Sequence, residues 1–449
     1  MVGNRFYRFR SIGRCRRRFC SGPHVNAEEA AQLVRELQGS SNCSHPIRLR
    51  GEIINTATGE VSERDLRVAC KDRREVVCPA CSYLYRADTW ILVSTGLVGG
   101  KGTPVVVGTH PRLFVTLTAP SFGAVHTIRD NGSCVARSRS SKSQCVHGRP
   151  TSCSRRHTEQ DVELGRPLCE KCFNYRGAVL WNAHASRLWN NTIQLIRRLL
   201  AAEGGFGQPN LGMVAQLHYL KVAEVQRRGL AHFHCVLRLD GPESIDVEPP
   251  NWATVELLQR VVRTSIERAQ APDIDGRPVR WGRVYDIQDL ARREEEAVKV
   301  AGYVAKYAAK TTDGSKELAR RFRTRRQIVT LVDDPHLRRL ALTAWDLGGE
   351  AKYDSLRLKE HAHTFGFTGQ LITKSRAFST TFAALRSART EYMAGERDGD
   401  PVEGTFHFEG RGYDDPRATQ LAELFFTFER ELKAEARARE RAKSEETSS

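Results

Sequence analysis

The strongest constraint on the fold of this chain is a short polar motif, Glu224-Val-Gln-Arg-Arg-Gly-Leu-Ala-His-Phe-His234. The flanking residues 220–226 and 230–239 are rich in Val, Leu and Ala with strand-like alternation, and the Arg-Arg-Gly between them suits a turn. This pattern predicts a β-hairpin. Because side chains alternate faces along a strand, His232 and His234 project from one side and Phe233 from the other. A tight turn sets Glu224 opposite His232 on the same face.

Two imidazoles and a carboxylate on one face form a candidate metal site. A mixed nitrogen and oxygen set suits Mn²⁺ or Mg²⁺, with positions left open for a substrate, better than a closed structural zinc site. We therefore predict that His232, His234 and Glu224 hold a divalent catalytic ion. The alternative is ordinary packing, the more common role of a His-hydrophobic-His triplet, with Glu224 as a solvated carboxylate on an edge strand.

Further along the chain, residues 294–310 have the spacing of an amphipathic helix. One side is made of Ala and Val, and the other carries the candidate catalytic residues Tyr303, Lys306, Tyr307 and Lys310. A tyrosine hydroxyl can attack a phosphodiester and form a covalent intermediate if a metal ion or a cation stabilises the developing charge. Hairpin and helix together indicate metal-assisted DNA nicking. The alternative is a surface helix whose tyrosines pack at the boundary of the core.

The apolar stretches do not indicate a membrane protein. The longest, around residues 90–98 and 178–183, fall far short of the ~20 residues that a spanning helix requires. The arginine-rich N-terminus lacks the apolar core of a secretory signal. We expect a cytoplasmic protein.

Twelve cysteines in a cytoplasmic protein favour metal binding over disulfides. Two Cys-x-x-Cys pairs each follow two more distant cysteines, and thiolates at such spacing favour Zn²⁺. We predict two structural zinc sites, the second with His147 and His157 as rival ligands. Cys235, facing away from the histidines, is expected to be a buried inert thiol. The first site comprises Cys43, Cys70, Cys78 and Cys81, and the second comprises Cys145, Cys153, Cys169 and Cys172.

The charge of the chain indicates an acidic partner. Its formal net charge is +17 and its pI is near 9.5. Arginines gather in residues 5–18 and again in residues 320–326, and both runs could follow phosphates. Such runs can equally be a solvated face or a disordered arm. No phosphate-binding Gly-rich loop is found, so no helicase activity is expected in this chain.

Three motifs, in this order, resemble those of the HUH endonucleases, and specifically the RepSA-like rolling-circle replication initiators of actinobacterial plasmids and integrative elements. Further stretches resemble that plasmid family itself, among them residues 77–82, 99–102, 165–172, 361–369 and 373–376. The three motifs are Phe114-Val-Thr-Leu-Thr-Ala-Pro-Ser-Phe-Gly123, Gly229-Leu-Ala-His-Phe-His-Cys-Val-Leu-Arg-Leu-Asp-Gly241 and Gly302-Tyr-Val-Ala-Lys-Tyr-Ala-Ala-Lys310.

The resemblance implies an α+β fold in which an HUH core, an antiparallel sheet with flanking helices, carries zinc-binding insertions and a mostly helical C-terminal region. We expect a basic N-terminal arm (1–40), a zinc-binding region (41–104), the HUH core (105–312) with an inserted cysteine cluster (134–175), an accessory or DNA-binding region (313–415), and a C-terminal helix with a disordered tail (416–449).

The activity implied by the resemblance is nicking and joining of origin DNA, single-stranded or supercoiled, with host helicase and polymerase as further partners. Tyr307 attacks first, a 5′-phosphotyrosine forms and a 3′-OH is left as a primer, while Tyr303 serves the second transfer. Two alternatives stay open: an HUH transposase or relaxase, and a zinc-dependent DNA-binding regulator without catalysis. The sequence does not predict the oligomeric state.

Overall fold

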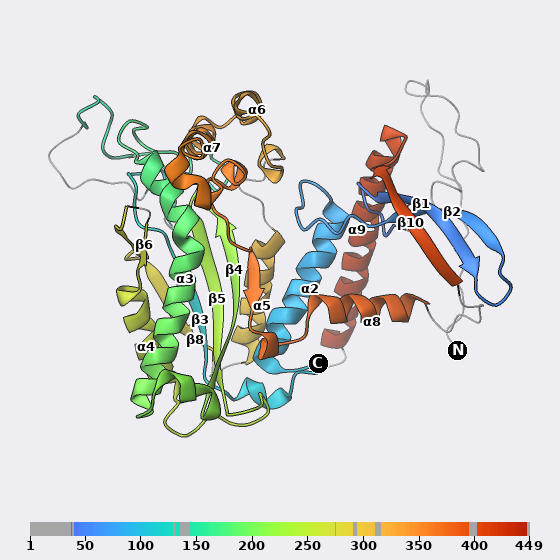
Figure 1. The fold of residues 1–449 in the computed structure, drawn as a ribbon, viewed down its shortest axis with the longest axis horizontal. Coiled ribbons are helices and arrows are strands. Elements are labelled where there is room, and N and C mark those ends of the chain that lie inside the picture. The colour runs from blue at the N-terminus through green and yellow to red at the C-terminus, as the bar shows by residue number, and fades with distance from the viewer. Residues whose placement is uncertain are drawn as a thin grey trace.

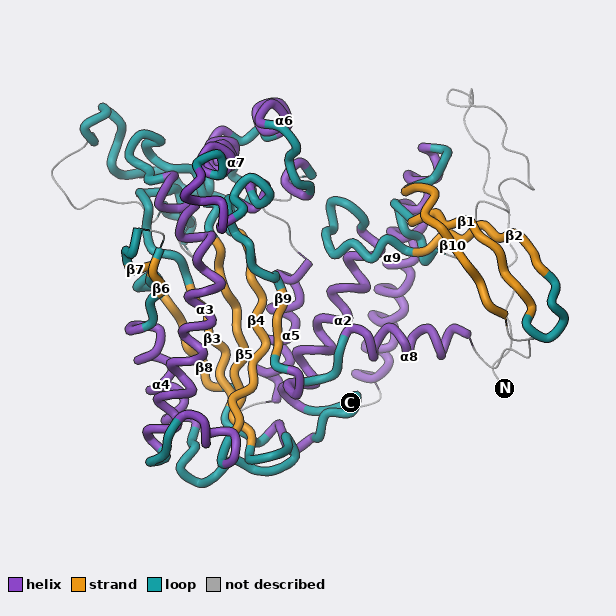
Figure 2. Tube along the Cα trace, viewed as in Figure 1, coloured by secondary structure: helices purple, strands orange, loops and turns teal. Residues whose placement is uncertain are grey.

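The computed structural model describes residues 37, 40–128, 131–134, 144–273, 275–290, 294–309, 316–394 and 402–446. These residues form an α+β fold with antiparallel sheets and helices, as the sequence predicts (Figures 1 and 2). Two features named above lie outside the described residues: Lys310, and almost all of the basic arm at 1–40. None of the described helices is long and apolar enough to cross a membrane.

A five-stranded antiparallel sheet forms the centre of the fold, in the order β8-β3-β5-β4-β9. The predicted hairpin is confirmed as its strands β4 and β5, and the register sets Glu224 opposite His232. The strands are β3 (Arg112–Leu117), β4 (Gln216–Val225), β5 (Ala231–Asp240), β8 (Tyr285–Asp289) and β9 (Ile372–Lys374).

Helices cover both faces of this sheet (Figure 1). Alternation along β5 explains the division, because Phe233, Cys235 and Leu237 pack into the core on one face and Val236 into the core on the other. On the first face lie α3 (Tyr175–Glu203), α4 (Val255–Arg268) and α7 (Pro335–Leu347), with α6 (Arg325–Leu331) against α7; on the second lie α2 (Pro79–Val98) and α5 (Glu294–Ala309).

A second, three-stranded sheet joins distant parts of the chain. Its middle strand β1 (Ile47–Asn55) pairs with β2 (Val61–Val68) on one side and with β10 (Val402–Arg411) on the other. The blue and red strands that lie side by side in Figure 1 are therefore β1 and β10. Two further helices, α8 (Phe382–Ala394) and α9 (Pro416–Glu446), contact α2.

The strand pairings of β9 and β10 cross the boundaries of the consecutive regions that we expected from the sequence. β9 lies in the 313–415 region yet forms an edge of the central sheet, so the core does not close at residue 312. β10 lies in the same region but pairs with a strand of the 41–104 region. A three-residue strand has too little periodicity to be recognised, and pairing between remote strands leaves no local pattern.

The segment at residues 278–289 forms two separate strands. Its first residue belongs to β7 (Pro278–Val279), which pairs with β6 (Ala271–Pro272), and its end belongs to β8. The chain bends between them at Gly282, whose N–H donates to the Thr118 carbonyl at 2.8 Å. A Cβ at Gly282 would lie 2.5 Å from the Ala119 carbonyl oxygen, so only glycine fits this close approach.

Candidate active site and metal centres

The turn of the hairpin fixes how β4 and β5 present their side chains. The Gln226 N–H donates to the Leu230 carbonyl at 3.0 Å and the Gly229 N–H to the Gln226 carbonyl at 2.7 Å. Gly229 has φ +76°, and a Cβ there would lie 2.1 Å from the Cδ1 of Leu340 on α7. Glycine is thus required both by the backbone and by the helix packed on the turn.

Glu224, His232 and His234 are all buried on the face of the sheet that α5 covers. The His232 and His234 ring centroids are 4.6 Å apart, and Oε2 of Glu224 lies 3.9 Å from Nε2 of His234. Nδ1 of His232 and Nε2 of His234 make no hydrogen bond within the described part of the chain. Burial, then the neighbouring His234 and Arg228, lowers the pKa of His232 to about 3, so its ring is neutral near pH 7.

Unpaired imidazole nitrogens in a buried site fit a metal ligand set. Each such group costs roughly 1–3 kcal/mol when it is left without a partner. The 3.9 Å between Glu224 and His234 is too long for a hydrogen bond. An ion about 2.1 Å from each atom can nevertheless bridge up to roughly 4.2 Å. The three residues do not form a group whose ligand atoms all lie within 4.8 Å, so a side chain must rotate for all three to reach one ion.

The two predicted tyrosines lie over His234. The ring centroids of Tyr303 and Tyr307 are 5.1 and 4.7 Å from that of His234, and 4.7 Å from each other. They are held there because the opposite side of α5, made of Ala297, Val300, Ala301, Val304, Ala305 and Ala308, is buried as the helical spacing predicts. Hydroxyls, imidazoles and the carboxylate therefore meet at one place.

The protonation of Tyr303 is set by its surroundings. Burial, a hydrogen bond with Tyr307, and the charges of Tyr307 and Glu224 raise the pKa of its hydroxyl, while the exposed Lys306 lowers it. The pKa of Tyr303 is raised overall, so its hydroxyl remains protonated at neutral pH and can donate a proton.

Basic side chains surround two cavities beside this cluster. The smaller, about 210 Å³, is lined by Glu224 together with Arg73, Arg74, Arg321, His361 and His363. The larger, about 1020 Å³, is lined by Arg321 as well, with Lys316, Arg320, Arg323 and Lys359. Two acidic residues, Glu317 and Glu360, also line it, and Glu360 lies 3.2 Å from Arg321. The sequence singled out the run at 320–326 but not Arg73 and Arg74, which precede α2 and reach the site only because α2 packs on α5. Arg73 donates to the Ala308 carbonyl at the end of α5, at 3.3 Å.

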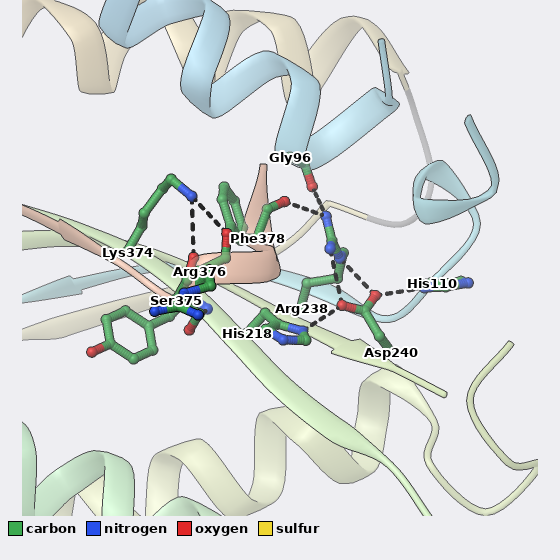
Figure 3. A network of polar contacts seen from close by, with 10 residues as sticks. Gly96, His110, His218, Arg238, Asp240, Lys374, Ser375, Arg376 and Phe378 are labelled. Atoms are coloured by element: carbon green, nitrogen blue, oxygen red, sulfur yellow. Dashed lines mark hydrogen bonds and ion pairs between the residues drawn. The ribbon is translucent and has the colours of Figure 1, made fainter. Parts of the chain in front are cut away.

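A second polar cluster occupies the far end of the same two strands (Figure 3). Asp240 accepts two hydrogen bonds from the buried Arg238 guanidinium, at 2.7 and 2.9 Å, and one each from His110 and His218, both at 2.7 Å. Arg238 also donates to the carbonyls of Gly96 on α2 and Phe378. Sequence reasoning missed this cluster, because its partners come from four separate segments.

The first predicted cysteine set, Cys43, Cys70, Cys78 and Cys81, is brought together in the structure. Sγ–Sγ distances are 3.6 Å for Cys70–Cys81 and 3.7 Å for both Cys78–Cys43 and Cys81–Cys43. Four sulfurs placed tetrahedrally about 2.3 Å from zinc are about 3.8 Å apart. Phe426 of α9 packs on the group. The geometry can hold a zinc ion.

The second predicted set is changed in one member. Cys145, Cys169 and Cys172 gather with His147, while Cys153 lies in a third group with His126, Cys134 and His157. A tight turn, in which Gly148 N–H donates to the Cys145 carbonyl at 2.9 Å, brings His147 back beside Cys145. Cys153 lies beyond this turn. Cysteine spacing could not distinguish the two arrangements, although His147 was recognised as a rival ligand.

Comparison with known proteins connects these features to a family. The family model described as RepSA, replication initiator protein of pSAM2, matches residues 29–426. A replication initiator protein of Streptomyces ambofaciens is 38% identical over 398 residues, covering 83% of this chain and 82% of the relative. The chain belongs to the RepSA family. Its RepSA match includes the hairpin, both tyrosines and all three Cys/His groups, and it confirms the family predicted from the motifs. No solved structure matches.

Proposed function

We propose that this RepSA-family protein initiates plasmid replication as a metal-dependent HUH endonuclease that nicks and rejoins origin DNA. One observation carries the proposal: two tyrosine rings lie on a buried histidine whose Nε2 makes no hydrogen bond with any described residue and lies 3.9 Å from a carboxylate oxygen. Nδ1 of His232 also makes no hydrogen bond with the described residues. Both imidazoles therefore have a nitrogen available to a ligand.

The chain's residues account for the chemistry. His232, His234 and Glu224 would hold Mg²⁺ or Mn²⁺, which supplies charge that polarises the scissile phosphate. The Tyr307 oxygen attacks phosphorus and gives up its proton, the bond from phosphorus to the 3′-oxygen breaks, and the leaving 3′-oxygen takes up a proton to become the 3′-OH primer. DNA stays attached through a 5′-phosphotyrosine. A 3′-OH attacking the same phosphorus displaces the Tyr307 oxygen and reverses the reaction. We assign Tyr303 to the second transfer.

The electrostatics of the site suit a nucleic acid. Arg321 lines both basic cavities, so a strand whose phosphate lies beside Glu224 can continue along Arg320 and Arg323. The net charge of +17 draws DNA to the protein without regard to sequence. Lys310, predicted as a further cation, belongs to the same proposal.

The remaining roles follow from the same assignment. Structural zinc would occupy Cys43, Cys70, Cys78 and Cys81, and a second ion the group of Cys145, His147, Cys169 and Cys172. Origin DNA is the proposed substrate, host helicase and polymerase continue from the primer, and the protein acts in the cytoplasm.

A nicking assay tests the proposal. Wild-type protein with Mg²⁺ or Mn²⁺ should relax a supercoiled plasmid that carries its origin and form a covalent adduct with a single-stranded origin oligonucleotide. Tyr307→Phe should form no adduct. Tyr392→Phe, at an exposed tyrosine of α8, is the matched control and should react like the wild type. Binding without any change of topology would instead identify a non-catalytic regulator.

A further inference from the structure

The third Cys/His group lies in the segment between β3 and α3. Cys134, Cys153 and His157 are buried, His126 is half-buried, and all four ligand atoms lie within 4.8 Å of one another. His126 and His157 are 31 positions apart in the sequence, yet Nδ1 of the first lies 3.3 Å from Nε2 of the second. The fold thus brings two thiols and two imidazoles together at one buried position.

The separations match one tetrahedral ion. Ligands about 2.05 Å (nitrogen) and 2.3 Å (sulfur) from zinc have N–N and N–S distances of about 3.3 and 3.6 Å. The structure gives 3.3 Å for the two nitrogens, 3.6 Å from Cys153 Sγ to His157 Nε2, and 4.0 Å from Cys134 Sγ to His126 Nδ1. A closed set of two thiolates and two imidazoles is typical of structural zinc rather than of a catalytic site.

An outer partner orients one of the ligands. The Nδ1 of His157 lies 2.9 Å from a carboxylate oxygen of Asp161. A proton shared with that carboxylate resides on Nδ1, which leaves the lone pair of Nε2 directed at the group. Carboxylates commonly hold metal-binding histidines in this way.

From this geometry we propose that His126, Cys134, Cys153 and His157 form a third zinc site, of Cys₂His₂ type, in addition to the two cysteine-rich groups. Zinc there ties together two stretches of chain already joined by backbone contacts, since the His157 N–H donates to the Gly132 carbonyl at 2.8 Å.

The site is connected to the turn that carries the catalytic hairpin. The Asp161 carbonyl accepts a hydrogen bond from Arg227 at 3.1 Å, and Arg227 lies between Glu224 and His232 in the chain. Gly165, with φ +89°, packs so closely on Arg227 that a Cβ would lie 2.6 Å from its carbonyl carbon. The Gly165 N–H in turn donates to the carbonyl of the ligand His126 at 2.8 Å. The segment that carries the proposed zinc ligands therefore packs on the hairpin turn and restricts its movement.

Zinc counting on the purified full-length protein tests this site independently of nicking. Wild-type protein should contain three zinc ions per chain by atomic emission, and Cys134→Ser should contain one fewer. Cys134 is the chosen position because it belongs to neither cysteine-rich group. Cys235→Ser is the matched control: that thiol is also fully buried but lies in the core beside Phe233, and the variant should keep the wild-type count.

Two further variants keep the result decisive. Cys134→His supplies another zinc ligand, so it should restore the wild-type count even if Cys134→Ser is too unstable to purify. Cys78→Ser removes a ligand of the first group, and combining it with Cys134→Ser should lower the count by two. The site would be overturned if Cys134→Ser bound as much zinc as the wild type. It would also be overturned if the double variant Cys78→Ser/Cys134→Ser bound as much zinc as Cys78→Ser alone. A folded wild-type protein whose count is accounted for by the two cysteine-rich groups alone would overturn it as well.

Discussion

The two ends of one face of the β4–β5 hairpin carry polar clusters of opposite character. Among the described residues, the turn leaves Nδ1 of His232 and Nε2 of His234 without hydrogen bonds. At the far end, the Asp240 carboxylate accepts four hydrogen bonds, and Nε2 of His110 is left without one. Between them lies a fully buried apolar layer of Leu220, Val222 and Val236. Burial is similar at both ends, so the difference is in how the polar groups are paired.

Under the proposed function, this contrast distinguishes a structural cluster from a reactive one. The four hydrogen bonds to the buried Asp240 carboxylate stabilise its charged form. Arg238, which donates two of them, also holds α2 to the sheet through the Gly96 carbonyl. Buried nitrogens without partners cost roughly 1–3 kcal/mol each, a sizeable part of a typical stability of about 5–15 kcal/mol. Such a cost is retained where a ligand later satisfies the groups.

The largest expected effect is on nicking, from His234→Ala or His232→Ala. Either should reduce cleavage on the order of 10³-fold or more, because the proposed ion loses a ligand, while duplex binding stays within a few-fold since phosphate contacts dominate affinity. Glu224→Ala should be milder. Nicking and gel-shift assays measure the two quantities. His218→Ala, at the other end, is the matched histidine control; it should nick normally per folded molecule. Wild-type nicking by all three site variants at limiting metal would contradict the metal site.

The next effect is on stability, from Asp240→Asn. It removes the charge that pairs the fully buried Arg238 guanidinium and should lower the free energy of unfolding by about 3–5 kcal/mol. Chemical denaturation measures it. A nicking defect as large as that of His234→Ala in the folded fraction would remove the distinction between the two ends.

The stability lost in Asp240→Asn should also depend on pH. Burial raises the pKa of Asp240, but hydrogen bonds from His110, His218 and Arg238 hold it below the usual carboxyl value. The stabilisation is therefore present above about pH 4 and is lost as the pH falls through the lower folded-state pKa. The difference between wild type and Asp240→Asn should shrink in acid.

A smaller effect concerns Lys221, on the opposite face of the hairpin. Burial lowers its pKa from 10.5 to about 8, and its ammonium lies 4.6 Å from the Phe233 ring centroid. The unfolded chain binds this proton more tightly, so the lysine should destabilise the fold below pH 8, and stability should rise by about 3 kcal/mol between pH 8 and 10.5. Lys221→Met should remove this rise in denaturation curves. An identical pH profile in both proteins would show that Lys221 is not desolvated.

The smallest change separates the two tyrosines. Tyr303→Phe should still form the covalent adduct, within a factor of about three of wild type, because Tyr307 and the ion ligands remain. The closing transfer should be impaired. Both steps can be followed with a labelled origin oligonucleotide, and the adduct peptide can be sequenced. Recovery of a phosphotyrosine at Tyr303, with adduct formation by Tyr307→Phe, would reverse the assignment.

Elements with strong local periodicity were predictable from the sequence. The register of the hairpin followed from two alternating segments and a short turn, and the buried side of α5 followed from helical spacing. The first cysteine set was also grouped in advance. The arginines at 73 and 74 were not connected with Glu224, because nothing near them in the sequence marks which helix α2 will contact.

By itself, the sequence determined which residues could carry chemistry and on which face of their own strand or helix each would lie, because these depend on periods of two and 3.6 residues. Only the tertiary structure decided which of them meet. It placed the tyrosines of α5 over His234, exchanged Cys153 for His147 in the second cysteine group, and paired β10 with β1. Such contacts join segments far apart in the chain, and they are selected by the packing of whole faces rather than by any local pattern.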